Sequence, residues 1–137
     1  MKTISNRALF CSLAVLALAV AGMSSLQAQQ TAEIKRTVLI KHDGSMTGHE
    51  AVMASVEIPP GLSEAKHTHP GDLTVYLAAG ALTVQIEGEP TIDVKAGEAF
   101  FVPAEKVHWA SNKGSVPART IGAFYVEKGK PLSSPAK

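Results

Sequence analysis

The chain has 137 residues, of which 13 are lysine or arginine and 12 are aspartate or glutamate, so its formal net charge is +1. A balance this even gives no basic footprint for nucleic acid and no attraction to an anionic membrane surface, so neither partner is expected. The length suffices for one compact domain, without a second.

The first 28 residues have the layout of a secretory signal peptide. Lys2 and Arg7 form a positive start, residues 8–21 are almost wholly apolar, and small residues precede an expected cleavage site after Ala28. The apolar run is shorter than the roughly 20 residues that a membrane span needs, and an uncleaved anchor is the alternative. Cleavage would export the protein to the periplasm or the cell exterior and would remove Cys11, the single cysteine. The mature chain is then expected to form no disulfide and to have no contact with a membrane.

Beyond the expected cleavage site, the sequence predicts a series of short β-strands. Residues 29–36 form a polar, flexible lead-in, the domain is expected over 37–127, and residues 128–137 are expected to be a loose tail. Within the domain, short runs of alternating apolar and polar residues are separated by turn residues about every 8–12 positions. The expected strands cover residues 37–40, 51–58, 73–77, 81–87, 91–94, 99–102, 108–110 and 119–126. The third and fourth of these are expected to pair as a hairpin around Gly80.

This pattern predicts an all-β fold, because no window of the mature chain has a sustained 3.6-residue apolar period. A chain of this kind must protect the edges of its sheets, and closing or doubling the sheet does so. We therefore expect a single jelly-roll β-barrel whose interior is lined by alternate residues of several strands.

Three of the five histidines are candidate metal ligands. His67 and His69 are two residues apart, so on an extended strand both side chains point to the same face. His108 lies on a later strand, and the three imidazoles can converge inside a barrel. Such a site would suit iron, zinc, manganese, nickel or copper, and ligand type alone does not choose among them. The alternative for a His-x-His pair is a solvated loop, and His42 and His49 are interpreted as surface residues.

The spacing around these histidines resembles the two motifs of the cupin family. The matching residues are Gly61, His67, His69 and Gly80 for the first motif, and Gly97, Pro103, His108 and Asn112 for the second. The resemblance implies a jelly-roll barrel, a divalent metal on the three histidines, and a homodimer formed through barrel edges.

The chain departs from the family pattern at two positions. Glu105 replaces a glycine of the second motif, which predicts a different turn. Leu73 occupies the position of a glutamate that is commonly the fourth metal ligand in the family. The neighbouring Asp72 would point to the opposite face of the strand unless a bulge shifts the register. Either the site has three histidines, or the metal has been lost and the histidines form a polar patch.

A largely apolar pocket is expected beside the histidines, lined by side chains that continue the same inward face. The candidates are Leu73, Val75, Leu77, Phe101 and Trp109. The aromatic candidates are alternatively core residues or contacts between subunits. Asn112 is interpreted as fixing a turn. The nearest acids in sequence, which include Glu64, have no position that requires them to point inward.

Two classes of function are open at this point. The first is a metal-dependent enzyme of the oxygenase or isomerase type, acting on a small polar or chelating molecule. The resemblance permits this, because some cupin dioxygenases that act on thiols or diketones use three histidines, and the chemistry would then fall on the metal. The second is a non-catalytic protein that binds a small molecule, with or without metal, since fold alone does not decide function.

Overall fold

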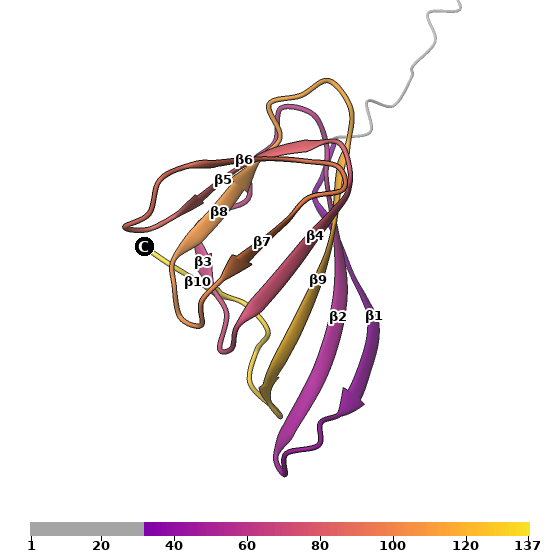
Figure 1. Ribbon diagram of the computed structural model, residues 1–137, viewed down its shortest axis with the longest axis vertical. Helices are drawn as coiled ribbons and strands as arrows, with labels where there is room; N and C mark the ends of the chain where they lie inside the picture. Colours follow the sequence, from indigo (N-terminus) through magenta and orange to yellow (C-terminus); the bar gives the residue numbers. More distant parts are fainter. Residues whose placement is uncertain (1–31) are drawn as a thin grey trace, which may run out of the picture. The chain divides into compact units, whose positions relative to one another are not determined.

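The structure is a computed structural model that describes residues 32–137, so the expected signal peptide lies outside the described residues. Figure 1 shows this part of the chain as strands joined by loops and turns. The strands are β1 Lys35–Asp43, β2 His49–Ile58, β3 His67–Thr68, β4 Leu73–Ala79, β5 Ala81–Ile86, β6 Ile92–Lys95, β7 Ala99–Val102, β8 His108–Ser111, β9 Ala118–Glu127 and β10 Ser134–Pro135. A search of residues 32–137 for a helix able to cross a membrane found none.

The strands form two five-stranded sheets that share one core. Sheet A has the order β1-β2-β9-β4-β7, and sheet B has the order β10-β3-β8-β5-β6. Every pairing in both sheets is antiparallel. This double-sheet jelly roll confirms the predicted fold class.

Alternation along the strands builds the core, because side chains at every second position point inward. In β4 and β9 buried and exposed residues follow one another almost without interruption. Leu77 of β4 and Val84 of β5 are both fully buried and belong to the same apolar cluster, although they lie in different sheets. Burying a side chain of this size stabilises the fold by roughly 1.5–3 kcal/mol. The core therefore holds the two sheets together.

The predicted hairpin around Gly80 is wrong. β4 pairs with β7 and β9, whereas β5 pairs with β6 and β8, so the chain passes from sheet A to sheet B at this glycine. Gly80 has a φ of +77°, and a Cβ here would lie 2.7 Å from the carbonyl oxygen of Pro117. Gly80 therefore forms a corner between sheets, where both the dihedral angle and the close approach exclude a side chain.

Both ends of the predicted domain also need correction. β1 begins at Lys35, inside the stretch expected to be a flexible lead-in. The expected loose tail contains β10, which pairs with β3 so that Pro135 lies opposite His67, and Ala136 N–H donates to the carbonyl of Lys66 at 3.0 Å. A proline is compatible with this position because β10 is the outermost strand of sheet B and its missing N–H breaks no inner ladder.

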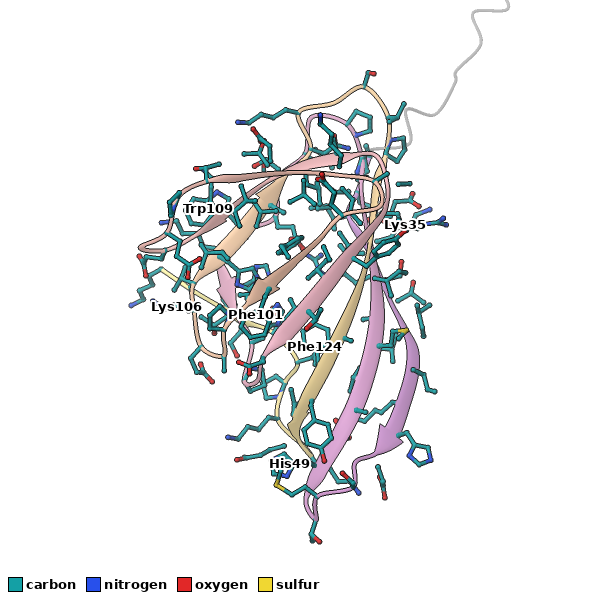
Figure 2. The ribbon with its side chains drawn as sticks, viewed as in Figure 1. Lys35, His49, Phe101, Lys106, Trp109 and Phe124 are labelled. Atoms are coloured by element: carbon teal, nitrogen blue, oxygen red, sulfur yellow. The ribbon has the colours of Figure 1, made fainter. Side chains whose placement is uncertain are left out.

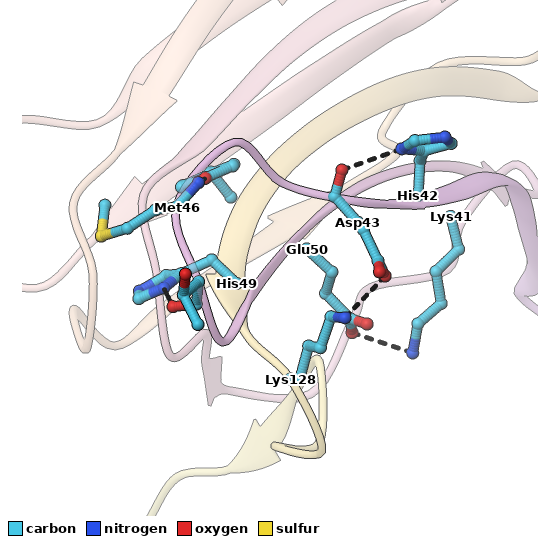
Figure 3. Close-up of polar contacts among 9 residues, drawn as sticks. Lys41, His42, Asp43, Met46, His49, Glu50 and Lys128 are labelled. Carbon is cyan, nitrogen blue, oxygen red and sulfur yellow. Dashed lines mark hydrogen bonds and ion pairs between the residues drawn. The ribbon is translucent and has the colours of Figure 1, made fainter.

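Polar contacts fix the far end of the β1–β2 hairpin (Figure 3). Lys41 Nζ lies 2.8 Å from a carboxylate oxygen of the buried Glu50, and Lys128 Nζ lies 2.7 Å from a carboxylate oxygen of Asp43. The backbone N–H of Met46 donates to the hydroxyl of Tyr125 at 2.9 Å. These contacts join the hairpin to β9 and to the residues that follow it.

Candidate metal centre

Three histidines lie together, two on neighbouring strands of sheet B and the third just after β3. His67 on β3 is the direct cross-strand partner of His108 on β8, and His69 follows two residues after His67. One ring nitrogen from each histidine lies within 4.8 Å of one from each of the others, and the ring centroids are 4.3 to 4.9 Å apart. The structure thus brings together the three histidines that the sequence singled out.

Each of the three imidazoles is oriented by a hydrogen bond from Nδ1 to a backbone carbonyl. His67 Nδ1 lies 2.8 Å from the oxygen of Ala65, and His108 Nδ1 lies 3.0 Å from that of Lys106. His69 Nδ1 lies 2.7 Å from the oxygen of Leu132, in the C-terminal segment. A carbonyl only accepts, so each Nδ1 carries a proton, and in a neutral imidazole Nε2 then keeps a free lone pair. This is the arrangement in which imidazole binds a metal, so the residues fit a divalent ion.

Burial favours the neutral form of two of these imidazoles, which is the form that binds a metal. Burial lowers the pKa of His69 to about 4, while its hydrogen bond to Leu132 acts in the opposite direction. The pKa of His108 is also lowered, again chiefly by burial. One edge of His69 meets the ring of Phe124 at 4.9 Å between centroids, so an apolar wall contributes to this burial.

No carboxylate takes the fourth position of the histidine cluster in the described residues. Leu73 points inward from β4, as its 6% exposure and its place in the cavity wall show. Asp72 instead accepts a hydrogen bond from the backbone N–H of Ala104 at 2.9 Å and so positions the loop before β8. The prediction that Asp72 faces away from the cluster agrees with this contact.

Glu105 lies in a turn with a φ of +61°, the left-handed conformation that glycine adopts without cost. That this turn differs from the one in the family motif stays a prediction. The N–H of Glu105 donates to the carbonyl of His69 at 2.9 Å, which joins the turn to the histidine cluster. Contacts on both sides therefore hold the turn in a conformation that its own residue disfavours.

Asn112 fixes a turn, as its position in the second motif suggested. Its Nδ2 donates at 2.8 Å to the carbonyls of Ile58 and Val116, and its Oδ1 accepts from Gly114 N–H at 2.9 Å. The side chain is fully buried and lies outside the cavity lining. Its function is therefore to connect the end of β8 to β2.

A cavity of about 170 Å³ opens beside the histidines. Most of its wall is apolar and comes from both sheets, so a bound molecule would be enclosed by the two inward faces. The lining residues outside the histidine cluster include Val38, Ala54, Val56, Leu73, Val75, Leu82, Val84, Phe100, Ala110, Thr120, Gly122, Phe124 and Leu132.

Two of the five pocket candidates line this cavity, namely Leu73 and Val75. Leu77 lies in the apolar core beyond it. The other two expectations, for Phe101 and Trp109, are corrected (both side chains are labelled in Figure 2). Phe101 is 50% exposed on the outer face of sheet A, and Trp109 packs under Lys66, whose Nζ lies 4.9 Å from the ring centroid. Side chains alternate along a strand, and the residues next to Phe101 and Trp109 point inward, so these two side chains point outward.

The structure adds two charged residues to the cavity wall that sequence reasoning missed, Arg36 and Glu64. Arg36 was assigned to the flexible lead-in, and Glu64 lies in an irregular segment between β2 and β3, where no strand periodicity indicates which way a side chain points. His42 and His49 lie outside both the cavity wall and the histidine cluster. His42 is exposed, and His49 stacks on Tyr125 at 5.5 Å.

Comparison with known proteins places this arrangement in a family. The profile described as "Cupin domain" matches residues 54–124, which span the histidine cluster and most of the strands. Tetracenomycin polyketide synthase protein TcmJ of Streptomyces glaucescens is 37% identical over 70 residues, covering 50% of this chain and 46% of that protein. Germin-like protein 9-3 of Oryza sativa subsp. japonica is 32% identical over 85 residues, covering 58% of this chain and 40% of that protein. The chain spans less than half the length of these two relatives.

Solved structures share the fold at lower sequence identity. DMSP lyase DddQ from Ruegeria pomeroyi superposes with a TM-score of 0.64 at 19% identity, covering 75% of this chain and 51% of that one. A conserved protein with a double-stranded beta-helix domain from Klebsiella pneumoniae gives a TM-score of 0.62 at 21% identity, covering 78% of this chain and 87% of that one. At these identities the likeness supports the fold alone.

Proposed function

This chain belongs to the cupin family, and from that membership and its histidine cluster we propose that it is an exported metal-dependent enzyme acting on a small chelating molecule. His67, His69 and His108 would hold one divalent transition metal. The observation that carries the proposal is the set of three Nδ1 hydrogen bonds to carbonyls, which leaves three Nε2 lone pairs free at one place. A polar patch without metal would have no need of this common orientation.

Three neutral ligands determine what the metal can do. Because no carboxylate of residues 32–137 joins the histidine cluster, a bound divalent ion would keep its full positive charge and several open positions toward the apolar cavity. A chelating substrate would supply the missing oxygen ligands. Nitrogen-only coordination favours iron, zinc, nickel or copper over the harder manganese ion. The metal would contribute Lewis-acid polarisation or oxygen activation, as in oxygenases and isomerases.

The protein would supply orientation and a dry site. The carbonyls of Ala65, Lys106 and Leu132 hold the imidazoles in place, and Phe124 shields His69 from water. Apolar walls from both sheets would exclude water from the bound substrate and strengthen its electrostatic contacts.

Metal analysis tests the first part of the proposal. Mature protein purified from its native compartment, without tag or chelator, should contain close to one transition metal per chain. His67→Ala, His69→Ala and His108→Ala should each lose it, while the matched controls His42→Ala and His49→Ala, outside the cluster, should retain it. If the native protein contains no metal, and takes up none on incubation with iron, zinc, manganese, copper or nickel, the metal-centre proposal is wrong.

The enzyme is distinguished from a non-catalytic binder by turnover. In an enzyme, His108→Ala removes metal and activity together. In a metal-free binding protein, the same substitution changes affinity for the small molecule by only a few-fold. The second outcome would replace the enzyme with a protein that senses or sequesters a ligand.

The export part of the proposal rests on the layout of residues 1–28. Mass spectrometry of the protein from the periplasmic or extracellular fraction should give a chain that begins at Gln29. A full-length chain confined to the cytoplasm would refute export.

A further inference from the structure

The cavity wall contains one pair of oppositely charged side chains, within the part of the chain that the structure describes. Arg36 Nη2 donates to Glu64 Oε1 at 2.8 Å, and both residues line the cavity. Apart from the three histidines, the other lining residues are apolar or uncharged. The ion pair therefore stands out chemically in a wall that is mostly apolar.

Strand register places Arg36 on the inward face. Arg36 on β1 is the cross-strand partner of Val56 on β2, and Val56 is itself a lining residue. Glu64 is held from the other sheet, because its backbone N–H donates to the carbonyl of Ala110 on β8 at 2.9 Å. The pair thus joins the edge of sheet A to the inner strands of sheet B across the cavity.

The two partners differ in exposure, and the difference assigns their roles. The side chain of Glu64 is 12% exposed, so its carboxylate depends on Arg36 for compensation of its charge. The side chain of Arg36 is 54% exposed and lies where the cavity meets solvent. A guanidinium has five N–H donors, and the bond to Glu64 uses one of them. The remaining donors are free to receive an incoming anion.

We propose that Arg36, held in place by Glu64, is the anchor for a carboxylate group on the molecule that this cavity binds. A guanidinium presents a planar fork that matches a carboxylate with two parallel hydrogen bonds. The ligand is then a small molecule with an apolar body and a carboxylate at the Arg36 end. This inference rests on the proposed function for the histidine cluster, where a second oxygen group of the ligand would meet the metal.

Cavity size limits the body of the ligand. A cavity of about 150 Å³ accommodates benzene, so the 170 Å³ here suits a ring or chain of similar size. Benzoate is therefore a suitable probe, and benzamide is its uncharged counterpart of nearly the same shape.

The variants must avoid leaving a buried charge without a partner. Arg36→Gln alone would leave Glu64 uncompensated, which both destabilises the fold and repels anions. The double variant Arg36→Gln/Glu64→Gln removes both charges and keeps two side chains that can hydrogen-bond to each other. Lys35→Gln is the matched control, because it removes one positive charge from the adjacent β1 position, which lies outside the cavity wall.

Calorimetric titration of the mature protein at about pH 8, where imidazoles are neutral, tests the proposal. The metal-free wild type should bind benzoate about tenfold more tightly than benzamide, since charge-assisted hydrogen bonds are roughly twice as strong as neutral ones. The ratio should fall to about one in Arg36→Gln/Glu64→Gln and should be unchanged in Lys35→Gln. Equal affinities in the wild type, or a preference that survives the double substitution, would overturn the inference.

Repeating the titration after zinc loading separates this inference from the proposed function. If the protein takes up no zinc but the Arg36-dependent preference persists, the carboxylate anchor holds and the metal centre fails. If zinc binds stoichiometrically to the three histidines and the preference is absent in both forms, the metal centre holds and the anchor is wrong.

Discussion

Replacing Leu73 by glutamate tests how this site differs from its family. Leu73 lies on β4 between Val102 and Phe124 of the neighbouring strands, and it lines the cavity that contains the histidine cluster. Leu73→Glu would direct a carboxylate toward the cavity from the position where the family motif has its acidic ligand. The substitution should have opposite effects on the metal-free and the metal-bound protein.

In the metal-free protein the substitution should be destabilising. Leu73 is 6% exposed, and its loss forfeits roughly 1.5–3 kcal/mol of apolar burial. A carboxylate in this wall would also be desolvated, which raises its pKa and adds a further cost of about 1–3 kcal/mol. The free energy of unfolding should therefore fall by about 2.5–6 kcal/mol. Leu73→Gln is the control, because glutamine has nearly the same shape as glutamate and loses the same apolar burial without introducing a charge.

In the metal-bound protein, the carboxylate of Leu73→Glu should be favourable rather than costly. A fourth, anionic ligand should raise manganese affinity at least tenfold over the wild type, because a hard ion gains most from a carboxylate. Urea unfolding with and without metal, together with manganese titration, measures both effects. If Leu73→Glu binds manganese no better than Leu73→Gln, then the side chain at position 73 does not reach the metal, and the comparison with the family ligand is wrong.

Three further predictions concern other parts of the fold. A chain that ends at Lys130 loses the carbonyl of Leu132, which orients His69, so its zinc affinity, measured by chelator competition, should fall about 10–100-fold. A chain that ends at Pro135 keeps this carbonyl and should match the wild type. An equal loss of affinity in both chains would contradict the role of the Leu132 carbonyl. Glu105→Gly should raise the free energy of unfolding by up to about 1 kcal/mol, since the turn already has a left-handed φ, while Glu105→Ala should give no such gain in urea titration. The homodimer expected from the family resemblance should appear as twice the monomer mass in sedimentation equilibrium, and Phe101→Lys, which places a charge among the exposed apolar side chains of sheet A, should give monomers; a monomeric wild type would refute the dimer.

The fold could be predicted from the sequence because side-chain alternation reports burial directly. The strands near residues 51–58, 73–77 and 119–126 were located within a few residues, since one buried face and one exposed face give a clear period of two. Strand pairing is a different matter. A glycine such as Gly80 is compatible with either a hairpin turn or a corner between two sheets. Only the strands that pair with β4 and β5 distinguish the two possibilities.

The errors in the predicted pocket residues arise from deciding which alternate positions of each strand point inward. An assignment that is one residue out exchanges the two faces: Phe101 is a pocket candidate, but its neighbour Phe100 is the residue that lines the cavity. Trp109 could have been excluded from the sequence, because the inward direction of His108 requires its neighbour to point outward. For β7 no residue indicates which alternate positions point inward, since none of its residues belongs to the histidine motif.

The C-terminal segment and Arg36 were missed for a common physical reason. Residues 131–137 and the start of β1 are polar or rich in proline, and composition of this kind predicts a solvated chain. Both segments are nevertheless ordered through backbone groups: β10 pairs with β3, and β1 pairs with β2. Backbone hydrogen bonds leave little trace in the side-chain pattern, so the sequence does not reveal them. These same segments bring the carbonyl of Leu132 to His69 and the guanidinium of Arg36 to the cavity. The features that shape the site beyond its three histidines therefore come from the parts of the chain where side-chain periodicity is weakest.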